Sequence, residues 1–207
     1  MTGTGTGWIL LALAVWGVVH SLLASFWFKG IVRQKFEKLY ERGYRLFFNV
    51  FAALSFLPIL ALVVLLPDAP IYTIPLPWSL LTLGVQGLAL VGLTYGVFQT
   101  GAMNFLGLEQ LMNPQAASQP RPLVTNGLYR YVRHPLYFFG LLLVWLVPRM
   151  SWNWLAFSIG VTLYLTIGTL FEERKLRQEF GEAYEQYRRR TPMLIPRLKR
   201  PPHIGLR

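Results

Sequence analysis

The sequence predicts an all-α integral membrane bundle of five transmembrane helices, followed by a carboxyl-terminal amphipathic interfacial helix. Hydrophobic residues make up 54% of the 207 residues and charged residues only 14%, whereas soluble domains carry about 25% charged residues. The apolar residues gather in five stretches separated by polar segments. Almost all lysine and arginine falls in alternate connections, which is the charge pattern of a multi-pass membrane protein.

The expected spans are apolar runs of the kind that cross or enter the hydrocarbon core. They cover residues 8–28, 44–66, 78–98, 136–147 and 152–171. No basic region precedes the first, so we expect a retained span and not a cleaved signal peptide. It contains His20, for which a functional role and an interhelical hydrogen bond are both open. Proline-rich residues 67–77 should not be helical, and Gly92 and Gly96 have the spacing of a close helix contact.

The basic residues predict the side of the membrane that each connection occupies. Of the 20 lysine and arginine residues, only Arg149 lies outside the connections next to the first, third and fifth spans. Cytoplasmic segments carry the excess of basic residues, so we expect the amino terminus outside and the carboxyl terminus in the cytoplasm. The net charge of +11 then reflects topology and contact with membrane lipid, and no nucleic acid partner is needed.

The start of the fourth span is one part of a candidate site. Its 12 residues make about 18 Å of helix, against a hydrocarbon core of about 30 Å. Either the helix begins upstream near Tyr129, or His134 and Pro135 lie below the membrane surface. Pro135 favours the second alternative, because proline suits the first turn of a helix. Such a helix start directs N–H groups and a positive dipole end toward the surroundings of His134, which would suit an anionic group.

The end of the fifth span supplies the other part of the site. The fourth span leads away from one membrane face and the fifth returns to it, so Glu172 and Glu173 should lie at the same face as His134. A carboxylate pair can bind an ammonium group, ribose hydroxyls or a sulfonium. The alternative is that both carboxylates end the helix and pair with the basic residues among 174–177 on a solvated face.

The sequence also predicts the structure of two further segments. Residues 172–190 place Leu176, Phe180, Tyr184 and Tyr187 at helical spacing among charged residues, which predicts an amphipathic helix at the interface that could cover the site. Residues 99–133 form a polar linker, and we expect residues 115–122 within it to be a loop.

Several motifs in the last third of the chain share the order and spacing of a known family. They are Arg133-His134-Pro135-x-Tyr137-x-x-Gly140, Glu172-Glu173-Arg174-x-Leu176, Phe180-Gly181, Tyr184-x-x-Tyr187 and Pro192-x-x-x-Pro196. This series resembles the carboxyl-terminal signature of the integral-membrane isoprenylcysteine carboxyl methyltransferase and phospholipid methyltransferase superfamily. His20-Ser21 and residues 104–108 are similar to the membrane methanethiol S-methyltransferases of that superfamily.

The resemblance implies an enzyme that uses S-adenosylmethionine, held between the start of the fourth helix and the end of the fifth. The implied cofactor-binding residues are His134, Pro135, Tyr137, Gly140, Glu172 and Glu173. His134 and Tyr137 would contact the amino-acid end of the donor, and Gly140 would allow its close approach. The chain has no soluble-type glycine loop for a nucleotide, so the donor must be bound by another architecture.

Methyl transfer from a sulfonium is an in-line displacement, so the site must align the reacting atoms and exclude water. The acceptor would be a lipophilic or small thiol, a carboxylic acid or a lipid. A thiol or acid must react as its anion, which a positive neighbour favours. We expect Arg174 first among Arg174, Arg133 and Arg190 in that role; the alternative is an ordinary inside-facing anchor.

Two other functions stay open at this point. A sterol-type membrane reductase shares a His-Pro-x-Tyr signature and uses NADPH, but that family usually has an acidic residue where this chain has Leu141. A non-catalytic accessory protein of the same fold is the other alternative. We expect one domain, residues 1–207, with its cofactor-binding part at about 128–196. With no cysteine and three scattered histidines, we expect no metal.

Overall fold

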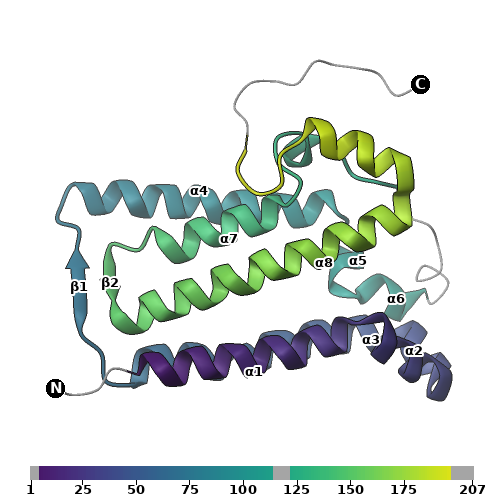
Figure 1. Cartoon of the computed structure of the whole chain (residues 1–207), viewed down its shortest axis with the longest axis horizontal. Coiled ribbons are helices and arrows are strands. Elements are labelled where there is room, and N and C mark those ends of the chain that lie inside the picture. The colour runs from purple at the N-terminus through teal and green to yellow at the C-terminus, as the bar shows by residue number, and fades with distance from the viewer. Residues whose placement is uncertain (1–4, 114–121, 197–207) are drawn as a thin grey trace.

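The structure, a computed structural model, describes residues 5–113 and 122–196, and it is almost entirely helical (Figure 1). Its elements are α1 (Thr6–Ala24), α2 (Phe26–Lys35), α3 (Glu37–Leu65), β1 (Pro70–Thr73), α4 (Trp78–Gln99), α5 (Ala102–Leu106), α6 (Leu108–Met112), a 3-10 helix (Gly127–Arg130), α7 (Pro135–Trp145), β2 (Arg149–Ser151) and α8 (Trp152–Arg190). The predicted all-α membrane bundle is confirmed.

Within the described ranges, four helices are long and apolar enough to cross a membrane: α1, α3, α4 and α8. The apolar helix α7 has only 11 residues, about 16 Å at the usual helical rise. It begins at Pro135, as the second of the two alternatives for the fourth span requires. The count of five crossings stays a prediction, because α7 is too short to cross unaided.

The core of the bundle lies where α1, α3 and α8 pack together. It is formed by Ile9, Leu13, Ile59, Val63 and Phe157. Many large apolar side chains on the same helices stay exposed, and Val64 and Leu65 keep 78% and 79% of their surface. Such extensive apolar exposure suits a protein whose surroundings are lipid chains.

The contact between α4 and α7 explains the two glycines of the third span. A Cβ atom on Gly92 would lie 2.5 Å from Cζ of Phe139, and one on Gly96 would lie 2.7 Å from Cδ2 of Leu136. Gln86 also donates to the carbonyl of Leu143 across the same contact, at 2.7 Å. Only glycine lets the two helices approach this closely, so the predicted close helix packing is confirmed.

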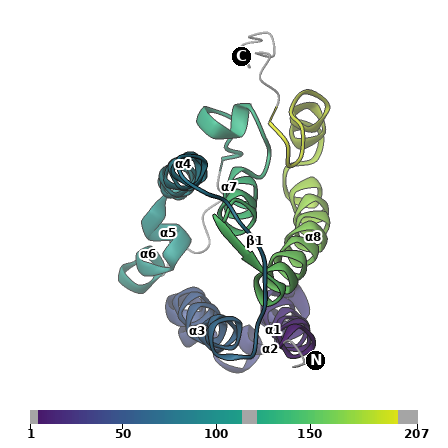
Figure 2. The same ribbon diagram turned by 90° about the vertical axis from the view of Figure 1, so that its left-hand side faces the viewer.

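The two ends of the bundle are formed by different elements. At one end β1 and β2 pair antiparallel, with Tyr72 opposite Met150. At the other end lie α2, α5, α6 and the last turns of α8 (Figure 1). Figure 2 shows α7 between α4 and α8. The sequence predicted non-helical backbone at residues 67–77 but did not predict the small sheet.

Several boundaries differ from expectation. The first span ends at Ala24, because Ser25 accepts the N–H of Phe28 at 3.2 Å and caps a separate helix α2. The second begins at Glu37, seven residues early. The expected linker at residues 99–133 contains α5, α6 and a 3-10 helix. Of the loop expected at residues 115–122, residues 115–121 lie outside the described ranges.

The expected interfacial helix is the continuation of α8. This helix passes Glu172 without interruption and reaches Arg190, with one sharp bend at Gly181. The backbone there has φ 53° and ψ −127°, a conformation that only glycine adopts readily. The bend turns the last two turns of α8 back toward the start of α7, and this return builds the site described below.

Asn153 fixes the start of α8 to the end of α3, and its loss should destabilise the bundle. Its Nδ2 donates to the carbonyls of Leu66 and Pro67, both at 3.2 Å, and its side chain is fully buried. Asn153→Ala removes both bonds, which leaves Pro67 O only the N–H of Gly5 as a partner, and should cost about 2–3 kcal/mol of unfolding free energy. Thermal unfolding in detergent measures the loss. Asn49→Ala removes a single hydrogen bond that is more exposed, so it should cost less. An equal loss in the two variants would contradict this role of Asn153.

Candidate functional site

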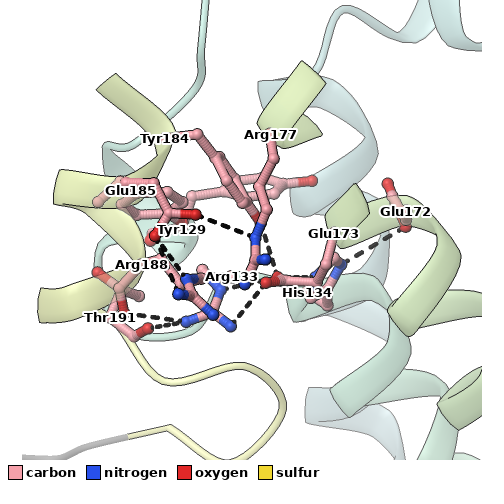
Figure 3. A network of polar contacts seen from close by, with 11 residues as sticks. Tyr129, Arg133, His134, Glu172, Glu173, Arg177, Tyr184, Glu185, Arg188 and Thr191 are labelled. Atoms are coloured by element: carbon pink, nitrogen blue, oxygen red, sulfur yellow. Dashed lines mark hydrogen bonds and ion pairs between the residues drawn. The ribbon is translucent and has the colours of Figure 1, made fainter. Parts of the chain in front are cut away.

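The candidate site lies where three segments meet: the start of α7, the middle of α8, and the chain just after the bend in α8 (Figure 3). His134 precedes α7, whose first residue Pro135 is fully buried. Glu172 and Glu173 come from α8, which runs back along α7. The hairpin formed by these two helices therefore brings the imidazole and both carboxylates together, as the sequence predicted.

Glu173 is the buried centre of this cluster, with 6% of its surface exposed. Arg133 donates to it twice, from Nε to Oε1 at 2.8 Å and from Nη2 to Oε2 at 2.9 Å. His134 Nε2 lies 2.8 Å and the Tyr184 hydroxyl 2.6 Å from the same Oε1. Paired bonds from arginine are among the strongest that a carboxylate accepts, so Glu173 is fully occupied by the protein itself.

Arg133 and His134 also hold the end of the described chain in place. The N–H of Arg133 donates to Pro192 O at 2.9 Å and the N–H of His134 to Met193 O at 3.1 Å. Arg133 Nη1 also donates to the carbonyls of Arg188 and Thr191. The segment after the bend thus covers one side of the cluster and buries Tyr184 completely.

Glu172 lies on the other side of the His134 ring from Glu173 and keeps 44% of its side-chain surface exposed. It accepts the Tyr137 hydroxyl at 2.8 Å and lies 3.5 Å from Nδ1 of His134. The rings of His134 and Tyr137 are nearly parallel, with centroids 5.5 Å apart. Of the two carboxylates, Glu172 therefore has the oxygen surface left to bind a ligand.

The surroundings of His134 favour its protonated form. Burial lowers its pKa, but the hydrogen bonds and negative charges of Glu172 and Glu173 raise the pKa by more, so the net shift is upward from the ordinary value. Both ring nitrogens face carboxylates, and both donate when the ring is protonated. The anionic groups expected beside the start of α7 are thus the protein's own carboxylates.

The two arginines proposed as acceptor neighbours lie in different places. Arg133 is in the cluster, where its guanidinium is committed to Glu173 and to backbone carbonyls. Arg174 is exposed, with its Cζ 5.7 Å from the ring centroid of Phe171. The structure does not bring it to Glu172 or His134, and its role stays a prediction, as does that of Arg190 at the end of α8.

Two glycines near Glu172, one on α7 and one on α8, each border open space, and the second of them was missed from the sequence. Gly140 lies three residues after Tyr137 and Gly168 four residues before Glu172, so both are about one turn deeper than that polar pair. Both glycines are half-buried, yet a Cβ on either would meet no described atom within 4 Å. Helical spacing from Glu172 is the signal that could have identified Gly168.

The opening beside these glycines has a hydrogen bond between α7 and α8 at each end. Tyr137 and Glu172 close it at one end, and Trp145 Nε1 donates to Thr162 Oγ1 at 2.9 Å toward the other. We call the space between these two contacts, beside Gly140 and Gly168, the glycine opening. A groove of about 600 Å³ lies elsewhere, between α1 and α3, and its lining is mostly apolar.

The part of the chain that forms this site matches a known protein family. The family model for phospholipid methyltransferases matches residues 82–183, which contain α7, the glycine opening and both glutamates. A methanethiol S-methyltransferase of a Pseudomonas species is 30% identical over 95% of this chain and 77% of its own length. The chain belongs to the isoprenylcysteine carboxyl methyltransferase and phospholipid methyltransferase superfamily. The resemblance inferred from the motifs is therefore confirmed.

Other members of this superfamily align over different shares of the chain. Methanethiol S-methyltransferase 1 of Bradyrhizobium diazoefficiens is 33% identical over 90% of this chain, which spans 65% of that relative's length. The protein-S-isoprenylcysteine O-methyltransferase of Schizosaccharomyces pombe is 32% identical over 52% of the chain and 53% of its own length. No solved structure matches the chain significantly. Among the described residues, no group of three or more His, Asp or Glu side chains could hold a metal ion.

The charge on His134 predicts a pH dependence of stability. Its pKa in the folded chain is above 6.5, so protonated His134 stabilises the fold; this contribution is complete below pH about 6.5 and is lost as the pH rises through the elevated value. His134→Gln should therefore be less stable than wild type at pH 6, and the gap should narrow at higher pH. Thermal unfolding across pH measures it; a gap that widens with pH would contradict the assignment.

Proposed function

We propose that the chain is an S-adenosylmethionine-dependent membrane methyltransferase that acts on a small thiol. The observation that carries this proposal is the half-exposed carboxylate of Glu172 at the mouth of the glycine opening. The relatives support it, since they are named as methyltransferases of methanethiol or of isoprenylcysteine. Those names give the reductase and accessory alternatives no support, and the greater coverage of the methanethiol enzymes favours a small thiol over a prenylated protein.

The residues at the opening fit such a donor. When bound, S-adenosylmethionine supplies an electrophilic methyl group on a sulfonium. Glu172 offers a carboxylate to an ammonium or to ribose hydroxyls, and the hydroxyl of Tyr137 holds that carboxylate in place. The bare faces of Gly140 and Gly168 leave room for a ligand that side chains would otherwise fill. Glu173 and Arg133 do not contact the donor in this proposal. They hold His134 and the segment after the bend at Gly181, the covering segment, in place.

The apolar walls of the hairpin supply the remaining requirement. Displacement at a methyl group is faster where the reactants are aligned and water is excluded. The opening lies between apolar helices, below the contact of Tyr137 with Glu172. We also infer that this end of the bundle faces the cytoplasm, because the basic residues of α2, of the 3-10 helix and of the last turns of α8 lie there (Figure 1).

Removing the charge of Glu172 should weaken donor binding. Glu172→Gln loses a charge-assisted bond, and the affinity for S-adenosylhomocysteine should fall about 10- to 100-fold. Calorimetry in detergent measures the affinity, and transfer of a labelled methyl group to ethanethiol measures the activity. Glu173→Gln serves as the contrast: it should speed proteolysis after the bend at Gly181. Full affinity in Glu172→Gln, or stabilisation of the wild type by NADPH alone, would refute the proposed function.

Filling the glycine opening should block the site without weakening the helix. Gly168→Leu adds a side chain where a Cβ meets open space, and leucine favours helix more than glycine does. Binding of S-adenosylhomocysteine should fall at least about tenfold, which is a loss of about 1.4 kcal/mol. Gly87→Leu is the matched control, because Gly87 lies on the exposed face of α4 and also meets no described atom. Equal binding in both variants would show that the opening holds no ligand.

A further inference from the structure

A polar pair joins α1 to α8 inside the apolar part of the bundle. The hydroxyl of Tyr164 on α8 lies 2.5 Å from Nδ1 of His20 on α1. Gly17 lets the two helices approach, since a Cβ there would lie 3.1 Å from Cδ2 of Tyr164. The interhelical hydrogen bond left open by the sequence is thus present. Polar groups at this depth are costly and usually functional, and the proposed donor site does not use this pair.

Aromatic rings hold the His20 imidazole in one orientation. Trp16 stacks on it with centroids 4.6 Å apart, and Phe48 of α3 lies 4.7 Å away. Trp16 directs its own N–H to Ser55 at 2.9 Å, so that N–H does not serve His20. The ring of His20 therefore packs against two aromatic rings, and its Nδ1 is directed to Tyr164.

Tyr164 connects this pair to the glycine opening. It lies four residues before Gly168, which is one helical turn, and Glu172 is one further turn along α8. The tyrosine thus stands between the opening and an imidazole on the neighbouring helix.

A thiol acceptor needs a base that the rest of the described site does not contain. Even the thiol of cysteine has a pKa of about 8.5 in water, and thiols react as thiolates. Arginine cannot take up a proton. Both ring nitrogens of His134 are held by the carboxylates of Glu172 and Glu173, and Glu173 is bound to Arg133. In the described ranges the other histidine is His20, and a neutral imidazole is the ordinary proton acceptor near pH 7.

We propose that His20 accepts the proton of the thiol acceptor through the hydroxyl of Tyr164, an inference that rests on the proposed methyltransferase function. The S–H bond of the acceptor breaks; its proton goes to Tyr164, and the Tyr164 proton goes to Nδ1 of His20. The acceptor sulfur then forms a bond to the methyl carbon, and the electron pair of the old carbon–sulfur bond returns to the donor sulfur. One positive charge disappears from the sulfonium and one appears on His20.

The groups that face His20 permit this change of charge. Tyr164 approaches from α8, Phe48 from α3 and Trp16 from α1, and of these only Tyr164 titrates. The nearest basic side chains along α3 and α8 are directed elsewhere, Arg45 to Asn104 and Lys175 to the carbonyl of Ala24. His20 also lies one turn from the carboxyl end of α1, where the helix dipole favours a positive group.

The test compares His20→Gln with wild type on two acceptors, ethanethiol and the more acidic ethaneselenol. At pH 7 the kcat/KM for ethanethiol should fall about 100-fold or more, whereas that for ethaneselenol, which is already anionic, should fall less than about tenfold. Raising the pH should restore thiol methylation, because the solvent then supplies the thiolate. Affinity for S-adenosylhomocysteine should stay within about twofold, well under the tenfold expected of a lost contact.

A second readout does not depend on turnover. Ethanethiol added to wild-type protein with S-adenosylhomocysteine at pH 7 should produce the ultraviolet absorbance of a thiolate, and His20→Gln should not. Tyr164→Phe keeps the ring and should share the selective loss with ethanethiol, so it carries the test if His20→Gln fails to fold. Ser55→Ala, on the far side of Trp16, should leave both acceptors unaffected.

The outcomes separate this inference from the proposed function. Wild-type rates with ethanethiol in His20→Gln or in Tyr164→Phe would overturn the inference while leaving the methyltransferase in place. An equal loss with both acceptors would also overturn it, because it would indicate a structural role for the pair. A wild-type protein that binds no S-adenosylhomocysteine and methylates neither acceptor would overturn the proposed function itself.

Discussion

One buried carboxylate determines how this end of the bundle is built. Glu173 receives two bonds from Arg133 and further bonds from His134 and Tyr184, which come from the start of α7 and from the chain after the bend in α8. An unpaired charge at this depth would cost several kcal/mol. The partners must therefore assemble together, and the bend at Gly181 allows the chain to bring Tyr184 back to complete the set.

The two adjacent glutamates have different tasks because successive residues on a helix point about 100° apart. Glu173 points into the cluster and stabilises the covering segment. Glu172 points along the hairpin toward Tyr137 and the glycine opening and keeps much of its surface free. The first thus gives the site its rigidity, while the second supplies the charge that a ligand would meet. Rigid support for an exposed charged group is what a preorganised binding site requires.

The sequence predicted those parts of the site that topology dictates. His134 and Glu172 had to meet once α7 and α8 were recognised as a hairpin, and Pro135 placed the start of α7 correctly. The division between Glu172 and Glu173 was not predictable, since it depends on the position of the covering segment. The β1–β2 pair was missed because strands of four and three residues, one in a proline-rich segment, carry no alternating pattern. Gly168 has the helical spacing from Glu172 that could have identified it, but the spacing alone does not distinguish a glycine beside open space from one at a helix contact.

Electrostatic balance links the cluster to the pair on α1. When His134 is protonated, Arg133 and His134 offset the charges of Glu173 and Glu172, and these four side chains are neutral together. A sulfonium brought to Glu172 adds one positive charge, and methyl transfer removes it. If the acceptor is a thiol, that charge must reappear as a proton, and it needs a place where a cation is stable. Trp16 stacks on His20 and Phe48 lies beside it, so a proton on His20 would meet aromatic faces, which attract cations.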